Sequence, residues 1–261
     1  MSPRKPLETV RRTTTHRWGE ERTIDIARGR EVVPATWIVP ASTGRVPVVL
    51  LLHGLSSNKE RMPSSAGRVL ASRGIASLAI DLPLHGERSG ANPRAMMSNP
   101  LALVGAWRTA VKEVHDVVSW IEGQASVDPS RIGVLGYSLG GFLALMAAAD
   151  DERLRVVALA AAGDLPDATP YASMVRALVD PPKAARKLRG RPLLLVNGRG
   201  DTTTRPAQAE RLFAAAEEPK TMLWYNGGHW PPPACINDTV DWLQGELELL
   251  AHDTDGGRRT V

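Results

Sequence analysis

The sequence predicts an α/β fold built on a doubly wound, mostly parallel sheet, and three observations support this prediction. Short apolar runs such as Pro47–Leu52 (PVVLLL) are continuous, which is typical of strands buried on both faces of a parallel sheet. Runs of this kind alternate with helical stretches to the end of the chain. The 261 residues, 43% hydrophobic and 23% charged, are enough for one domain with a sizeable core.

The first folded segment is expected to be an antiparallel hairpin. Residues 22–27 and 31–39 alternate polar and apolar side chains around Arg28-Gly29-Arg30, a pattern typical of paired strands. Pro34 predicts that the second strand is irregular or lies at a sheet edge, because proline has no amide to donate. The domain is expected over residues 22–250, between a mobile basic tail (1–21) and a flexible C-terminal tail (251–261).

The buried sheet begins at Pro47–Leu52, and the remaining elements follow it in alternation. The segment 81–100 is dense in Pro, Gly and Asn and predicts a long loop, which in compact domains is often functional. Helices are expected at 59–73, 101–123, 205–218 and 234–250, strands at 75–80, 155–161, 191–197 and 220–225, and a helical insertion at 164–189.

The stretch Arg131–Ala149 (RIGVLGYSLGGFLALMAAA) predicts a strand, a sharp turn and a helix. Its GxSxG sequence can form a nucleophile elbow, in which a strained turn projects the serine hydroxyl above the sheet edge. The flanking glycines allow strand and helix to approach closely. Ser138 is therefore the candidate nucleophile, and the alternative is a glycine-rich turn with a solvated serine.

A serine hydroxyl near neutral pH needs a base to activate it and a third group to orient that base. Functional groups on open parallel sheets gather in loops at the carboxyl ends of strands. Among the six histidines, His229 fits best, since it follows the strand 220–225 through Asn226-Gly227-Gly228. We therefore assign His229 as the general base, with a solvated loop histidine as the alternative.

The acid that orients His229 should also follow a strand. Asp201 does so in Asn197-Gly198-Arg199-Gly200-Asp201, and its carboxylate would hold the Nδ1 proton of His229. Asp164 follows the preceding strand and is the rival candidate. Asp201 could instead cap the helix that begins after it.

Negative charge on a carbonyl oxygen needs two fixed donors. The backbone N–H of Leu139, directly after the nucleophile and at the positive end of its helix, is one candidate. The other is the N–H of Leu55, in the His53-Gly54-Leu55 loop after the first buried strand. In this interpretation His53 shapes the loop without transferring protons, and His85 ties another loop together.

Five motifs, in this order and spacing, resemble the α/β-hydrolase family, and in particular its compact esterases and relatives of dienelactone hydrolase. They are LLHGLSSNKE, DLPLHGERSG, GYSLGG, NGRGD and GGH. The resemblance spans residues 46–250 and implies a sheet of the eight-stranded type. It also implies Ser138 as nucleophile, Asp201 as acid and His229 as base, with Leu55 and Leu139 as oxyanion donors. Dienelactone hydrolases themselves use a cysteine nucleophile, so Ser138 favours a serine esterase.

Composition limits the partners that we expect. The net charge of +4 is concentrated in residues 1–22, which hold six basic and three acidic residues, so a nucleic-acid partner is not expected. A single cysteine, Cys235, excludes an intrachain disulfide and favours a cytoplasmic location. The longest apolar runs are too short to span a membrane, and metal-binding or nucleotide-binding motifs are absent, so we expect no metal and no cofactor.

The sequence thus predicts a serine hydrolase that cleaves carboxylic esters of small to medium acyl groups through an acyl-enzyme. A thioesterase, a peptidase, an acyltransferase or a catalytically silent binding protein of the same fold are the alternatives. The insertions 84–100 and 164–187 are short and predict a partial cap. Trp230, Met96 and Met97 are candidates for the substrate pocket.

Overall fold

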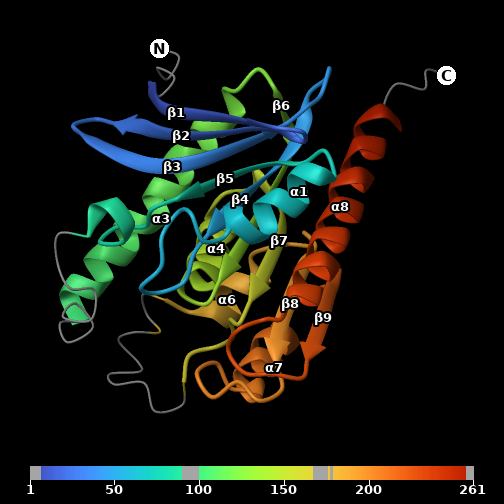
Figure 1. Ribbon diagram of the computed structural model, residues 1–261. Coiled ribbons are helices and arrows are strands. Elements are labelled where there is room, and N and C mark those ends of the chain that lie inside the picture. Colours follow the sequence, from blue (N-terminus) through green and yellow to red (C-terminus); the bar gives the residue numbers. More distant parts are fainter. Residues whose placement is uncertain (1–6, 90–99, 167–175, 177–178, 257–261) are drawn as a thin grey trace.

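The computed structural model describes residues 7–89, 100–166, 176 and 179–256, and within these ranges the chain forms one nine-stranded sheet (Figure 1). The spatial order is β1-β2-β3-β5-β4-β6-β7-β8-β9, and every pair from β5-β4 to β8-β9 is parallel. The strands are β1 (Glu8–His16), β2 (Gly19–Arg28), β3 (Glu31–Pro40), β4 (Val46–Leu52), β5 (Ala76–Ile80), β6 (Val127–Tyr137), β7 (Leu154–Ala160), β8 (Leu193–Gly198) and β9 (Lys220–Tyr225). The predicted α/β class with a mostly parallel sheet is confirmed.

The N-terminal part of the sheet differs from the expectation in two respects. Residues 8–16, expected in a mobile tail, form β1, an exposed edge strand paired with β2. Charged and polar side chains are compatible with an edge strand, where only one ladder of hydrogen bonds is made. The prediction from Pro34 is wrong, because β3 lies between β2 and β5 with an unbroken register. The Pro34 carbonyl still accepts a hydrogen bond from Asp81 N at 2.9 Å.

Helices cover both faces of the sheet, as its doubly wound connectivity requires. The helical segments are α1 (Arg68–Ser72), α3 (Pro100–Glu122), α4 (Leu139–Asp150), α6 (Pro181–Arg186), α7 (Pro206–Ala215) and α8 (Pro233–Gly256), with the single turns η1 (Pro63–Gly67) and η2 (Gly86–Arg88). α1 and α8 pack on one face, and α3, α4, α6 and α7 lie on the other (Figure 1). No helix among the described residues is long and apolar enough to cross a membrane.

The helix predicted from Lys59 begins later than expected. Residues 59–62 form turns, η1 starts at Pro63, and α1 ends before Gly74. At the other end of the chain, α8 continues to Gly256, beyond the expected end at residue 250. Of the predicted insertion at 164–189, the described part contains α6.

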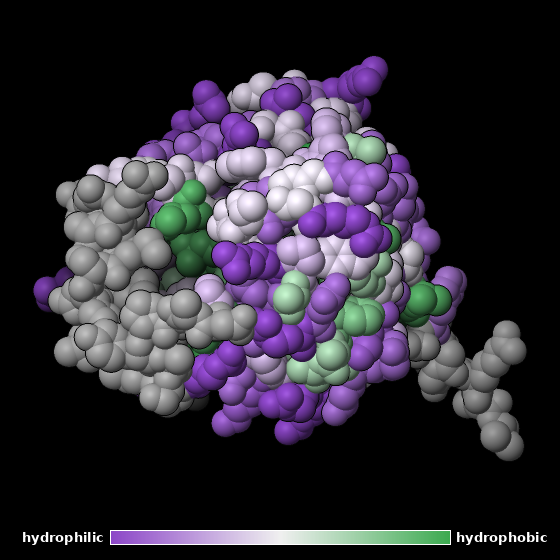
Figure 2. Space-filling model, turned by 90° about the horizontal axis from the view of Figure 1, so that it is seen from below, coloured by the Kyte–Doolittle hydropathy of each residue, from purple (hydrophilic) through white to green (hydrophobic). Residues whose placement is uncertain are grey.

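The carboxyl ends of the parallel strands define the edge on which the candidate site lies. The arrowheads of β8 and β9 point toward this edge, at the bottom of Figure 1. Seen from below, the described surface is mainly hydrophilic, with an apolar patch on the left of the view (Figure 2). The loops after β4, β5, β6, β8 and β9 meet here because parallel strands end on the same side.

Candidate active site

Ser138 occupies a strained turn between β6 and α4. Its backbone φ is 52° and its ψ is −114°, a backbone conformation that residues other than glycine rarely adopt. Two glycines make room for it: a Cβ on Gly136 would lie 2.2 Å from the Gly140 carbonyl oxygen, and a Cβ on Gly140 would lie 2.0 Å from the Leu52 carbonyl oxygen. The predicted elbow is therefore present in the backbone.

The turn brings Ser138 into a continuous hydrogen-bonded chain with two residues that are distant in sequence. Ser138 Oγ lies 3.0 Å from His229 Nε2, and His229 Nδ1 lies 2.8 Å from Asp201 Oδ2. The Asp201 side chain is fully buried, and that of His229 is 18% exposed. The acid is thus shielded from water, whereas the base keeps access to the surface.

Both oxygens of the Asp201 carboxylate have defined partners. Oδ1 accepts hydrogen bonds from Thr203 N at 2.8 Å and Thr204 N at 3.0 Å, which leaves Oδ2 for His229. Asp201 is not the cap of α7, because that position belongs to Arg205. The local turn instead fixes the orientation of the carboxylate toward His229.

Asp164, the rival acid, is engaged elsewhere. Its carboxylate pairs with Arg176 at 3.0 Å and with Arg211 at 3.1 Å, and it accepts a hydrogen bond from Leu165 N. Burial alone would raise the pKa of Asp164, but the two arginines and the Leu165 amide outweigh it and hold the pKa below its usual range. In this structure Asp164 ties the insertion after β7 to α7 and does not contact His229.

Two tyrosine hydroxyls hold the loop that carries His229, and sequence reasoning missed both. Tyr137 Oη donates to the His229 carbonyl at 3.2 Å, and Tyr225 Oη donates to the Gly228 carbonyl at 2.9 Å. Burial raises the pKa of Tyr225 to about 12 and that of Tyr137 further, so both hydroxyls stay protonated donors. The only available signal was position, since Tyr137 precedes the nucleophile and Tyr225 ends β9.

The loops of Asp201 and His229 also contact each other through their backbones. Gly200 N donates to the Gly227 carbonyl at 2.9 Å. A Cβ on Gly198 would lie 2.3 Å from the Gly228 carbonyl oxygen, so only glycine allows this approach. The glycines noted in both sequence motifs therefore serve to pack one loop on the other.

The candidate oxyanion donors lie on two segments in close contact. Leu139 begins α4, and Leu55 lies in the loop after β4. The contact of Gly140 with the Leu52 carbonyl places the first turn of α4 against the start of that loop. Gly54 packs on Tyr137, where a Cβ would lie 2.7 Å from the ring. This packing is compatible with the two amides serving one site.

His53 has the shaping role expected of it. Its Nδ1 donates to the Gly54 carbonyl at 2.8 Å, and its Nε2 accepts from Leu82 N at 3.2 Å. Burial lowers the pKa of His53 to about 4, which keeps the ring neutral and able to accept. His85 packs beside it, with 5.2 Å between the ring centroids, and its Nδ1 donates to the Pro83 carbonyl at 2.9 Å.

Of the candidate pocket residues, the described part of the chain includes Trp230. This side chain is 62% exposed, stacks on Tyr137 with a centroid distance of 5.0 Å, and lies 6.3 Å from the His229 ring. The guanidinium of Arg61 lies over the indole at 5.6 Å. Met96 and Met97 fall outside the described residues. In the ranges that the structure describes, no group of three or more His, Cys, Asp or Glu side chains could hold a metal ion.

Comparison with known proteins agrees with this architecture. Residues 49–235 match the model of the "Alpha/beta hydrolase family", which covers more than half of the chain. The protein therefore belongs to the α/β-hydrolase family, and the resemblance noted in its motifs is confirmed.

Individual relatives are more distant. The chain is 33% identical to the "Polyketide transferase ATR5" of Stachybotrys chlorohalonatus over 121 residues, which are 46% of this chain and 37% of that protein. The chain thus spans well under half the length of that curated relative.

Two solved structures share the fold. An esterase from an Arctic intertidal metagenomic library has a TM-score of 0.67 at 24% identity and covers 90% of this chain and 97% of its own. The acetyl xylan esterase of Paenibacillus sp. R4 has a TM-score of 0.74 at 18% identity, with coverage of 92% and 89%.

Proposed function

We propose that this protein is a serine hydrolase that cleaves carboxylic esters of small to medium acyl groups through an acyl-enzyme. The observation that carries the proposal is the chain of contacts from Ser138 Oγ to His229 and on to Asp201, at 3.0 Å and 2.8 Å. Both distances lie within the range in which a base can accept a proton and an acid can orient the base.

Each residue has a defined task in this mechanism. His229 Nε2 accepts the proton of Ser138 as Oγ attacks the ester carbonyl, and the same nitrogen then protonates the departing alkoxide. Asp201 keeps the Nδ1 proton in place and stabilises the imidazolium. Water, deprotonated by His229, attacks the acyl-enzyme and releases the acid, which restores Ser138.

The backbone amides of Leu139 and Leu55 are proposed to stabilise the tetrahedral intermediate. Leu139 lies at the N-terminus of α4, where amide groups are free of partners within the helix and the dipole favours negative charge. Leu55 lies in the loop against which α4 packs. Loss of one such donor typically lowers kcat by about 10² to 10³.

Trp230 is proposed to contact the substrate beside the catalytic histidine. Its exposed indole next to His229 offers a flat apolar surface, and Arg61 adds a positive charge at its face. An ester with a planar, negatively charged group would fit both features. The names of the two structural neighbours, an esterase and an acetyl xylan esterase, support esters, and the second supports short acyl groups.

The test of this function is labelling with a fluorophosphonate followed by intact-mass measurement and peptide mapping. We expect one adduct per chain, on Ser138, and hydrolysis of short 4-nitrophenyl esters. Ser138→Ala should abolish the adduct and lower kcat by about 10⁶, as removal of a serine nucleophile typically does. A folded wild-type protein that forms no adduct would contradict the proposal and favour a silent binding protein.

Acyl transfer is the second candidate, because one of the curated relatives, the protein of Stachybotrys chlorohalonatus, is named a polyketide transferase. An acyl-enzyme at Ser138 could be attacked by an alcohol or amine in place of water. The same labelled reaction, run with added alcohols, separates the two: a hydrolase gives the free acid, whereas a transferase gives mainly the new ester. Thioesters and peptides complete the substrate panel.

A further inference from the structure

A network of buried charges lies beside the loop that carries Leu55. Its core is an ion pair between Asp81 and Lys59. Asp81 directly follows β5, and Lys59 is the last residue of the loop after β4. Both side chains are buried, at 0% and 1% exposed. The tasks proposed above for Ser138, His229 and Asp201 do not require this network, so its position needs a separate explanation.

The loop from His53 to Lys59 is attached at both ends to the same point of the fold. At its start, His53 Nε2 accepts from Leu82 N at 3.2 Å. At its end, Asp81 Oδ1 accepts from Lys59 N at 2.7 Å. Leu55 lies between these two attachments. Its amide can therefore occupy a fixed position although this segment has no regular secondary structure.

Asp81 is built into a turn that leaves little freedom for its carboxylate. Oδ2 accepts from Glu87 N at 2.9 Å, so one carboxylate joins the loops after β4 and β5. The chain wraps closely around it at Gly86, where φ is 54° and a Cβ would lie 2.1 Å from Asp81 Oδ1. The site therefore has room for a carboxylate that accepts hydrogen bonds from two backbone amides, and no room for a larger side chain.

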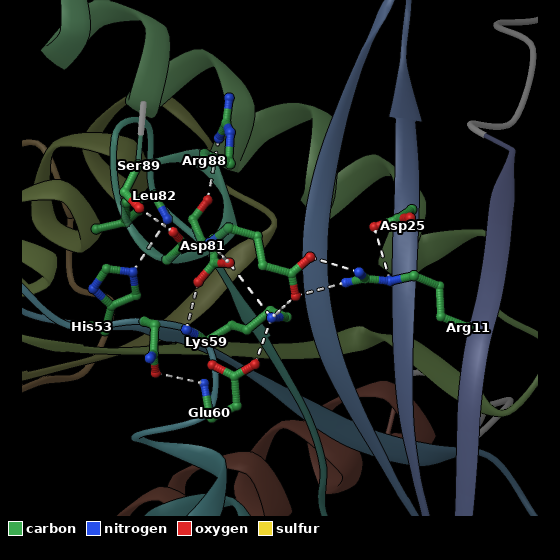
Figure 3. Close-up of polar contacts among 12 residues, drawn as sticks. Arg11, Asp25, His53, Lys59, Glu60, Asp81, Leu82, Arg88 and Ser89 are labelled. Atoms are coloured by element: carbon green, nitrogen blue, oxygen red, sulfur yellow. Dashed lines mark hydrogen bonds and ion pairs between the residues drawn. The ribbon is translucent and has the colours of Figure 1, made fainter. Parts of the chain in front are cut away.

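Lys59 compensates the buried charge and extends the network to the N-terminal strands. Its Nζ lies 3.6 Å from Asp81 Oδ2 and 2.5 Å from both Glu87 Oε1 and Glu60 Oε1. Glu87 is bound in turn by both terminal nitrogens of Arg11, at 2.6 Å and 3.0 Å. Figure 3 shows these contacts running from His53 and Asp81 through Lys59 to Arg11 and Asp25.

The backbone of β1 is shaped at the residue that completes this network. The pairing of β1 with β2 shifts register between Val10 and Arg12, which leaves Arg11 as the extra residue of a bulge. Bulges commonly redirect a side chain. Here the redirected guanidinium reaches Glu87, 76 residues away in sequence.

From these contacts we infer that Asp81 and Lys59 are positioning residues for the oxyanion loop, and that Glu87 and Arg11 anchor them to β1. The inference rests on the proposed function for the task of the loop, but not for its ordering. None of these residues touches the reacting atoms. They act by holding the backbone of residues 53–59, and with it the amide of Leu55.

The decisive variant is Asp81→Asn, which keeps the size of the side chain but offers one acceptor oxygen to two amides. We expect kcat to fall by about 10- to 100-fold, somewhat less than loss of the donor itself, with KM within threefold. Affinity for a boronic acid, which forms a tetrahedral adduct on the nucleophile, should fall by the same factor. A purely structural role would not weaken the boronate in proportion to kcat.

Two further variants test the network if Asp81→Asn does not fold. Lys59→Met and Arg11→Ala should both lower kcat, Arg11→Ala by about two- to fivefold, and Arg12→Ala on the same exposed strand is the charge-matched control. Amide hydrogen exchange of the peptide 53–61 should accelerate in the first two variants and not in the control. This readout needs no catalysis, so it separates failure of this inference from failure of the proposed function.

The inference is overturned if the folded variants keep wild-type kcat, boronate affinity and exchange of residues 53–61. It is also overturned if kcat falls while boronate affinity is unchanged, because the oxyanion donor would then be intact. Absence of ester hydrolysis in the wild type would count against the proposed function alone.

Discussion

The two loops that flank Ser138 are held by different kinds of contact. The backbone of the His229 loop is held by uncharged groups, namely two tyrosine hydroxyls and close glycine packing on the loop of Asp201. The loop from His53 to Lys59 is fixed by a buried carboxylate, a buried ammonium and a neutral histidine. Hydroxyl and amide donors do not titrate near neutral pH, whereas the second loop includes His53, whose ring accepts from Leu82 N only while it is neutral.

This difference fits the tasks proposed for the two loops. His229 must gain and lose a proton, and uncharged supports do not oppose that change. The oxyanion loop must keep a backbone amide in place while negative charge develops, which requires a rigid backbone. The largest changes in kcat should therefore follow substitutions around His229 and Asp201. The clearest effect of pH on stability should come from the loop that runs from His53 to Lys59.

Among the residues that hold the two loops in place, the largest effect is expected for Asp201→Asn. The amide cannot stabilise the imidazolium and favours the wrong tautomer of His229, so kcat should fall by about 10⁴. The matched control is Asp164→Asn, a second buried acid after a parallel strand, which should keep kcat within a few-fold because its partners are Arg176 and Arg211. Steady-state kinetics of both variants decides between the acids, and equal losses would contradict the assignment of Asp201.

That the sequence points to Asp201 and not to Asp164 has a physical basis. Both acids follow apolar runs, but two glycines shortly precede Asp201, as two precede His229, and the close approach of the two loops requires glycine at position 198. Continuous runs such as PVVLLL predict buried strands because burial on both faces leaves no room for polar side chains. The sheet, the elbow at Ser138 and the hydrogen-bonded set of Ser138, His229 and Asp201 could therefore be predicted.

The remaining features depend on contacts that periodicity does not encode. β1 has a polar sequence with nearly every side chain exposed, so it carries no signal of burial. Lys59 looks like the first residue of a helix, yet its backbone amide is bound by Asp81 and its buried ammonium by Asp81 and Glu87, which lie 22 and 28 residues away. Such long-range pairing of charges follows from the fold and cannot be read from local pattern.

We expect His53, in the loop from His53 to Lys59, to make the free energy of unfolding depend on pH. Burial lowers the pKa of His53 to about 4, below the value of about 6.5 expected in the unfolded chain. Between these values the unfolded state binds a proton that the folded state does not, so stability rises with pH through this window and is lost as pH falls from 6.5 toward 4. From pH 7 to pH 5 the free energy of unfolding should fall by about 2 kcal/mol through this group.

Urea unfolding at pH 7 and at pH 5 measures this change in the free energy of unfolding. His53→Gln, which can still accept from Leu82 N, should reduce the loss, whereas His252→Gln, on the exposed end of α8, should not. The groups that face His53 are His85, which opposes its protonation, and Asp81 and Glu60, which favour it. If His53→Gln and wild type lose the same stability between pH 7 and pH 5, His53 does not titrate as described.

The smallest change in kcat is expected for a substitution that affects the His229 loop. Tyr225→Phe removes only the hydroxyl that donates to the Gly228 carbonyl at 2.9 Å, a bond of about 1 kcal/mol, so kcat should fall by about fivefold. KM and the pH profile of kcat should stay unchanged, because no charge is altered and the His229–Asp201 contact remains. A shift of that profile by a full unit would contradict this prediction, because it would mean that the hydroxyl does more than hold the loop in position.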